Sequence, residues 1–93
     1  FEAEGRLTRA VQIDGAEAVI RMPLKDLVAL LDARDFVQLH RGLVVGRRWI
    51  GEAMRVGGDM VVTLRDRSER FPVSRHFQSQ FGDLPEDVAR SAA

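Results

Sequence analysis

Residues 50–73, IGEAMRVGGDMVVTLRDRSERFPV, decide the fold class of this chain. Three short runs rich in valine and other apolar residues are separated by a glycine-rich turn at 57–59 and a polar turn at 65–68. Short runs joined by tight turns in this way are typical of an antiparallel meander. We therefore predict one antiparallel sheet whose strands span residues 50–56, 60–64 and 69–73.

The segment before the meander, FVQLHRGLVVGRRW at 36–49, begins with a further short strand. Residues 36–39 alternate in polarity, as a half-buried strand does, and they run into the tripeptide at 40–42. A compact apolar run at 43–46 follows, and then an arginine pair at 47–48. We expect these basic side chains to lie in connecting segments rather than on the regular solvent face of a strand.

The first part of the chain predicts a β-hairpin. Residues 6–13 alternate with a period of two, which indicates a strand. The dipeptide Asp14-Gly15 suits the positive φ angles of a tight hairpin turn, and residues 16–22 supply the returning strand.

Two short helices complete the expected layout. Pro23 suits the first turn of a helix, and the apolar residues at 24, 27, 28 and 31 form a core-facing stripe, so a helix is predicted over 24–33. Ser74 is a favourable N-cap for a second helix, which Gly82 or Pro85 should end. The apolar stripe of this second helix consists of Phe77, Phe81 and Leu84. The predicted fold class is therefore mainly β, an antiparallel domain with two short helices.

Length and composition exclude several classes of protein. Ninety-three residues make one small domain, and no apolar run approaches the roughly 18–20 residues that cross a bilayer. The opening residues, FEAEGR, are acidic where a secretory leader needs basic charge, so no leader is expected. The absence of cysteine excludes disulfides, thiolate metal sites and cysteine nucleophiles.

The charge of the chain is zero overall but unevenly distributed. Residues 1–36 carry 5 basic and 7 acidic side chains, residues 37–76 carry 8 and 4, and residues 77–93 carry 1 and 3. The net charges are therefore −2, +4 and −2. Of the 14 basic residues 13 are arginine, whose rigid fork of donors suits phosphate and guanine. A GC-rich genome, which favours arginine codons, is the alternative explanation for this bias.

An enzymatic centre is not expected. His40 and His76 are the only histidines, whereas a zinc site takes three or four ligands. Ser74 lies two residues from His76, and on one helical turn their side chains point apart. We expect no catalytic residue, no metal, no cofactor and no small-molecule substrate.

Several arginines are placed to bind an anion instead. Arg41, Arg47 and Arg48 lie in connecting segments, and Arg75 lies at the expected start of the last helix, where backbone N–H groups point outward. The alternative is that these arginines only solvate a small core, balanced by acidic residues at 52, 66 and 69.

Four motifs in order decide between these alternatives: FEAEGRLTRA at 1–10, VIRMPLKDLVALLD at 19–32, FVQLHRGLVVGRRWI at 36–50 and FPVSRHF at 71–77. Together they resemble the LytTR (LytR/AlgR-type) DNA-binding domain of bacterial response regulators. The resemblance runs from residue 1 to about residue 84. It implies a LytTR-like domain over residues 1–85, with one or two further strands before residue 1, and a frayed tail over residues 86–93.

The resemblance also implies roles for particular residues. Such domains are elongated β structures that present loops to successive major grooves of DNA. Arg41 and Arg75 are then candidates for contacts with bases, and His40 is expected to be structural, bracing the strand end beside Arg41. The loop Glu4-Gly5-Arg6 makes a third contact region. The candidates for contacts with phosphate are Arg6, Arg47, Arg48 and Ser74.

The sequence departs from the family pattern at three positions. Gly42 stands where the family usually has serine, Gly46 where asparagine is common, and Leu43 where an aromatic residue is frequent. The fold remains credible, but a hydroxyl suited to phosphate is lost at position 42. Arg47 and Arg48 are then expected to supply compensating phosphate contacts.

The functional expectation is a sequence-specific, double-stranded-DNA-binding output domain of a bacterial transcriptional regulator. Such a domain acts on direct repeats or paired half-sites, under an upstream sensor or receiver domain. We expect it in the cytoplasm, with a membrane tether as an option for the upstream segment. The alternative is a protein-interaction module on the same fold with little affinity for DNA, which the zero net charge and Gly42 favour.

Overall fold

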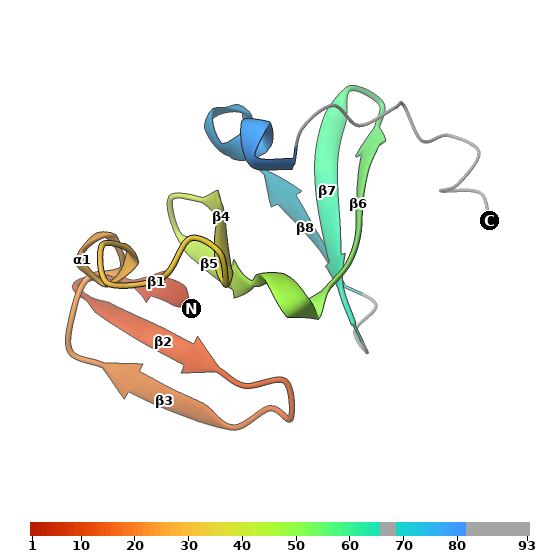
Figure 1. Ribbon diagram of the computed structural model, residues 1–93. Helices are drawn as coiled ribbons and strands as arrows, with labels where there is room; N and C mark the ends of the chain where they lie inside the picture. The colour runs from red at the N-terminus through yellow and green to blue at the C-terminus, as the bar shows by residue number, and fades with distance from the viewer. Residues whose placement is uncertain (66–68, 82–93) are drawn as a thin grey trace.

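The computed structural model describes residues 1–65 and 69–81, which form two antiparallel sheets with short helical segments between and after their strands (Figure 1). The first sheet has five strands in the order β3-β2-β1-β5-β4, and the second has three in the order β6-β7-β8. The elements are β1 (Glu2–Glu4), β2 (Leu7–Val11), β3 (Glu17–Ile20), α1 (Leu24–Val28), β4 (Phe36–His40), β5 (Leu43–Gly46), η1 (Arg47–Trp49), β6 (Ile50–Val56), β7 (Asp59–Leu64), β8 (Arg70–Val73) and η2 (Arg75–Phe81). The predicted mainly antiparallel β class is thus confirmed.

The predicted meander is the three-stranded sheet. Val56 on β6 pairs with Asp59 on β7, so the turn between them has only two residues, Gly57 and Gly58. Their φ angles are +59° and +89°, the left-handed region that a tight primed turn demands and that glycine adopts without strain. The last strand begins at Arg70, one residue later than predicted, and residues 66–68 of the predicted polar turn lie outside the described residues.

Strand β1 joins the two halves of the five-stranded sheet. It pairs with β2 through a two-residue loop, Gly5 and Arg6, and it pairs with β5 on its other side. The backbone N–H of Val44 donates to the Phe1 carbonyl at 2.9 Å, and the Phe1 nitrogen donates to the Val44 carbonyl at 2.8 Å. These bonds connect the N-terminal hairpin to the β4–β5 hairpin.

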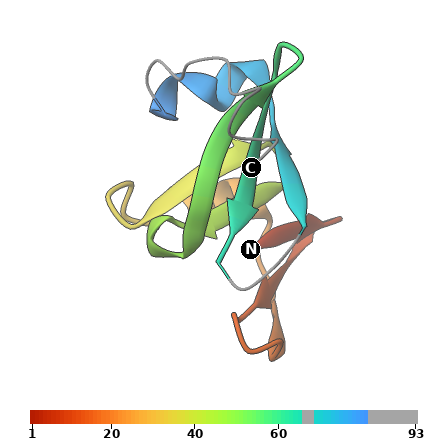
Figure 2. The same ribbon diagram turned by 90° about the vertical axis from the view of Figure 1, so that its right-hand side faces the viewer.

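The core lies between the three-stranded sheet and the β4–β5 hairpin. Figure 2 shows the two layers crossing, with the meander in front of the hairpin. The buried cluster consists of Val37, Leu39, Leu43 and Val45 from the hairpin and Met60, Val62 and Val73 from the meander. The outer strands β2 and β3 extend beyond this core, and Val19 on β3 is 62% exposed.

The predicted first helix is shorter than its apolar stripe. Helix α1 covers Leu24–Val28 instead of residues 24–33, and only Leu24 is buried. Beyond Val28 the chain makes isolated turns, and the Asp32 carboxylate accepts the backbone N–H of Arg34 at 2.8 Å. A side chain that bonds the backbone locally in this way competes with helix continuation.

The second predicted helix is a 3₁₀ helix rather than an α-helix. Segment η2 covers Arg75–Phe81, and Phe77 and Phe81 pack against the core as expected. The predicted stripe residue Leu84, the predicted stops Gly82 and Pro85, and the tail 86–93 lie outside the described residues.

The first hairpin forms, but its loop is longer than the predicted tight turn. Residues 12–16 connect β2 to β3, with Gly15 at a φ of +93° and the Asp14 carboxylate accepting the Ala16 N–H at 2.9 Å. Strand alternation places the fully buried Thr8 on the inner face, where its hydroxyl donates to the Met22 carbonyl at 2.8 Å. Periodicity did not identify β1, β5 or the short helix η1 as separate elements.

Candidate nucleic-acid interface

Arg41 lies at the tip of the β4–β5 hairpin, in a turn held by backbone groups. The N–H of Gly42 donates to Nδ1 of His40 at 3.1 Å, and the carbonyl of Gly42 accepts the N–H of Ala3 at 2.8 Å. Arg41 is exposed, and within residues 1–65 and 69–81 its guanidinium makes no hydrogen bond or ion pair. The turn is therefore ordered without using this side chain, which stays available to a ligand.

A β-bulge in β4 brings the segment that carries Arg75 close to the turn that carries Arg41. Gln38 pairs with Val44 and His40 with Leu43, so the intervening Leu39 has no partner on β5. Its carbonyl accepts the N–H of Ser74 at 2.9 Å instead. This bond fixes the junction of β8 and η2 beside the hairpin tip.

Arg75 directly follows this junction, as the first residue of η2. It is exposed, and its guanidinium has no partner among the described residues. Because η2 is a short 3₁₀ helix and not the expected α-helix, the Arg75 guanidinium is the feature suited to an anion here. Ser74 is exposed beside it.

Arg6 extends the same edge from the other side. It lies in the β1–β2 loop next to Gly5, whose φ is +64°, and its exposed side chain is likewise unpartnered in the described part of the chain. The Ala3–Gly42 bond ties the end of β1 to the β4–β5 turn. The loop, the turn and η2 follow one another along the left side of Figure 1. We call Arg6, Arg41 and Arg75 the arginine edge.

The structure separates the other two candidates from this edge. Arg47 and Arg48 form η1 with Trp49 at the opposite end of β5. Four strand residues span about 13 Å. Nε of Arg47 donates to the Ala33 carbonyl at 3.1 Å, and the guanidinium of Arg48 lies 5.3 Å from the centre of the Trp49 ring. Both side chains thus already have contacts within the chain.

The acidic residues near Arg6 are held by a neighbouring cation. Arg9 forms ion pairs with Glu2 and Glu17 at 3.2 Å and with Glu4 at 3.8 Å. The hydrogen bond that Arg9 donates to the Glu2 carboxylate is the main cause that raises the pKa of the Arg9 guanidinium. Glu4 precedes the Gly5–Arg6 loop, so Arg9 reduces the negative field that Glu4 presents to an approaching anion.

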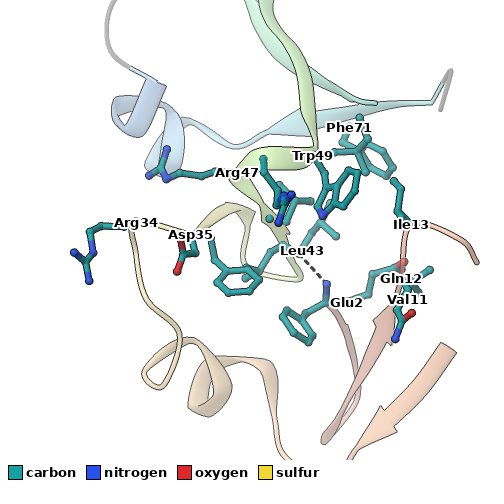
Figure 3. Close-up of a pocket in the computed structure, with 17 residues that line it drawn as sticks. Glu2, Val11, Gln12, Ile13, Arg34, Asp35, Leu43, Arg47, Trp49 and Phe71 are labelled. Carbon is teal, nitrogen blue, oxygen red and sulfur yellow. Dashed lines mark hydrogen bonds between the residues drawn. The ribbon is translucent and has the colours of Figure 1, made fainter. Parts of the chain in front are cut away.

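An apolar cavity of about 900 Å³ lies at the η1 end of the molecule (Figure 3). Trp49 and Phe71 line one side, Val11 and Ile13 face them, and Leu43 lies deep between. Arg47 lies at this cavity and none of the arginine edge does. In the described ranges, 1–65 and 69–81, no three metal-ligating side chains cluster, and no helix is long and apolar enough to cross a membrane.

Sequence reasoning did not identify two features of this edge. One is the bulge at Leu39, and the other is Gln80, whose side-chain amide donates to the Gln38 carbonyl at 2.8 Å. The bond joins positions 42 residues apart, so no local pattern marks it.

Comparisons with known proteins identify the family of the chain. The LytTR DNA-binding domain family matches residues 1–84. An uncharacterized response regulatory protein of Vibrio cholerae serotype O1 is 38% identical over 84 residues, which cover 86% of this chain and 31% of the relative. The chain thus spans about a third of the length of the relative that it matches. No solved structure matched. On the family match over residues 1–84, the chain belongs to the LytTR family of DNA-binding domains.

Proposed function

We propose that this domain binds double-stranded DNA with sequence specificity, with Arg41 and Arg75 contacting base edges. The observation that carries the proposal is the backbone bond between Leu39 and Ser74, which joins the segments that carry Arg41 and Arg75. Neither guanidinium has a partner among residues 1–65 and 69–81. A free arginine fork can bond guanine O6 and N7 together, and each such contact discriminates by about 1–3 kcal/mol.

The remaining residues take supporting roles in this proposal. Arg6 and Ser74 border the two base-contacting arginines and bind phosphates on either side. His40 is structural, since its ring nitrogen holds the Gly42 amide and so orders the turn that carries Arg41. Arg47 and Arg48 lie at the far end of β5, so their phosphate contacts would be peripheral.

We further propose that the domain is the output module of a bacterial transcriptional regulator. The relative from Vibrio cholerae carries the words response regulatory protein in its name and is about three times longer than the matched region. An upstream receiver or sensor domain would then control DNA binding, on direct repeats or paired half-sites. The site of action would be the cytoplasm, with or without a membrane tether upstream.

Two single substitutions test the proposal. Duplexes are selected from a random-sequence library with the wild-type protein, and their affinity is measured by mobility shift. Arg41→Ala and Arg75→Ala should each lose about 5- to 150-fold in affinity for the selected duplexes while circular dichroism stays native. Arg34→Ala is the matched control, because Arg34 is exposed, away from the arginine edge and paired with Asp32 at 2.9 Å. Wild-type affinity in both edge variants would refute the assignment.

The apolar cavity favours a second candidate function, a protein-interaction module with little DNA affinity. Trp49 and Ile13 are 36% and 37% exposed at this cavity, and the net charge of the chain is zero. Retention on random-sequence DNA at low salt separates the two functions. A DNA-binding domain should be retained with a dissociation constant of about 10⁻⁴–10⁻⁶ M, whereas an interaction module should not be retained.

A further inference from the structure

Segment η2 is longer than most 3₁₀ helices. It has seven residues, whereas runs beyond about three or four are uncommon because the i→i+3 hydrogen bonds have poor geometry. Such a helix depends on tertiary contacts to keep its shape and direction. Since Arg75 is its first residue, whatever holds η2 also orients the backbone from which Arg75 projects.

The three-residue period sorts the side chains of η2 into columns. Residues three apart eclipse one another, so Phe77 and Gln80 share a column, and His76 and Ser79 share another. Phe77 packs against the core, whereas His76 and Ser79 are both exposed. Gln80 is exposed as well, but it shares the column of Phe77, one turn further on, and its side-chain amide reaches the Gln38 carbonyl.

Gln80 bonds η2 to the strand that leads to Arg41. Its Nε2 donates to the carbonyl of Gln38 on β4 at 2.8 Å and to the carbonyl of Phe77 at 2.9 Å. Strand β4 is an edge strand of the five-stranded sheet, so a carbonyl on its outer side lacks a strand partner. Gln38 directly precedes the bulged Leu39, whose carbonyl holds Ser74. Two consecutive β4 residues thus accept hydrogen bonds from the two ends of one short segment.

The neighbouring glutamine makes a different connection. Nε2 of Gln78 donates to the Val73 carbonyl at 3.1 Å, and its Oε1 accepts from Arg55 at 3.4 Å. Val73 and Arg55 both belong to the three-stranded sheet. Gln78 therefore ties η2 to the sheet from which it emerges, while Gln80 ties it across to the sheet that carries Arg41.

We propose that Gln80 is a positioning residue for DNA recognition, which sets Arg75 relative to Arg41 through its bond to the Gln38 carbonyl. This inference rests on the proposed base-contacting role of Arg75. Two arginines discriminate a sequence together only if their separation matches the spacing of two base edges. Loss of the Gln80 bond leaves both arginines and the other anchors of η2, namely the Ser74–Leu39 bond, the Gln78–Val73 bond and the packing of Phe77. It removes the side-chain bond that ties η2 to β4, the strand that leads to Arg41.

The test uses Gln80→Met, which keeps the length of the side chain and removes its donor, in the full chain. Affinity for duplexes selected by the wild-type protein should fall about three- to tenfold, the range expected for one hydrogen bond. Affinity for unselected random-sequence DNA should not change, because no charge is altered. Ser79→Ala is the matched control, one residue away on the exposed column, and should behave like wild type in both measurements.

A double-mutant cycle separates positioning from general stabilisation. If Gln80 acts through Arg75, Gln80→Met should have no further effect on DNA affinity in an Arg75→Ala background. An additional loss in that background, or an equal loss on selected and unselected DNA, would overturn the positioning role. Wild-type affinity for selected duplexes in Gln80→Met, with Arg75→Ala impaired, would also overturn it. Wild-type affinity in Arg75→Ala itself would instead count against the proposed function.

Discussion

Both ends of the β4–β5 hairpin carry exposed arginines, but the arginines differ in whether they contact other groups of the chain. At one end Arg41 lies in a turn that is held by His40, Gly42 and Ala3, and its guanidinium is unpartnered in the described part of the chain. At the other end Arg47 bonds the Ala33 carbonyl and Arg48 lies over the ring of Trp49. Arginines that are close together in sequence therefore differ in whether their guanidinium groups are available to bind a ligand.

The difference comes from how each end holds its backbone. The turn at Arg41 satisfies its polar groups with backbone bonds and one imidazole, so the arginine is not needed for structure. In the η1 segment the guanidinium of Arg47 holds the preceding loop through the Ala33 carbonyl. An arginine that must first break an internal contact binds a new ligand less favourably, which predicts that the two ends contribute unequally to DNA binding.

The largest effect is expected when arginines are substituted in pairs, one pair at the Arg41 end of the hairpin and one pair at the η1 end. Arg41→Ala with Arg75→Ala should abolish discrimination between selected and random duplexes, because each removes about 1–3 kcal/mol of base recognition. Arg47→Ala with Arg48→Ala should weaken both duplexes alike and reduce the slope of log affinity against log salt by at most about 0.9 per lost phosphate contact. Fluorescence anisotropy over a salt series measures both quantities. Equal effects of the two pairs on discrimination would contradict the comparison.

A smaller effect is expected from the residue that holds the Arg41 turn. His40→Ala removes the acceptor of the Gly42 amide and should lower affinity for selected duplexes about three- to tenfold. His40→Asn should retain most of the affinity, because an asparagine oxygen accepts the N–H two residues further on in the same way. Mobility-shift titrations of the two variants make the check. If His40→Asn is as impaired as His40→Ala, the imidazole itself contacts DNA and is not merely structural.

Substitutions of Gly42 and Gly46 test the difference between the two ends of the hairpin in another way. A Cβ on Gly42 would lie 3.4 Å from Cε1 of His40, an ordinary contact, whereas a Cβ on Gly46 would lie 3.1 Å from Cδ1 of Trp49, so the indole would have to shift. Gly42→Ser should therefore fold normally and raise DNA affinity by a few fold through its hydroxyl, about the worth of one hydrogen bond. Gly46→Ser should lower the melting temperature without that gain. Unchanged affinity in Gly42→Ser would show that no phosphate lies beside the turn.

The smallest effect concerns the exposed ion pair between Asp32 and Arg34. The hydrogen bond from the Arg34 side chain lowers the pKa of the Asp32 carboxyl below its usual value. A lowered pKa in the folded state stabilises the protein above the unfolded pKa, and that contribution is lost as pH falls through the folded pKa. Arg34→Ala should move the midpoint of the Asp32 carboxyl resonance upward in an NMR titration, with little effect near neutral pH. An unchanged midpoint would mean that the pair does not persist in solution.

Much of the fold could be predicted from local patterns. The meander at 50–73 formed as expected, because glycine pairs and apolar alternation specify turns and strands within a few residues. Strand β1 was missed by periodicity because Glu2–Glu4 is short and largely polar, and its central place depends on partners at Arg9 and Leu43. The helix over 24–33 was predicted too long, since α1 ends at Val28 and the apolar stripe continues into turns in which the N–H groups of Leu30 and Leu31 bond the carbonyls three residues earlier.

The candidate site was also predicted only in part from the sequence. The motifs identified Arg41 and Arg75 as candidates, and their similarity to a family supplied the expected roles. The bulge at Leu39 and the Gln80–Gln38 bond were not predictable, because each involves a backbone carbonyl whose partner lies far along the chain. Composition gave no means of separating Arg41 from Arg47, since both follow apolar strands within the basic middle segment.

The sequence by itself determined the antiparallel class, the basic middle of a neutral chain and the membership of the LytTR family. These properties depend on residue type, alternation and motif order, which are all local. The tertiary structure alone decided which arginines remain unpartnered, that η2 is a 3₁₀ helix, and that Arg6, Arg41 and Arg75 share one edge. The physical reason is that hydrogen bonds between distant segments, such as Ser74 to Leu39, determine both where a side chain projects and whether it is already engaged.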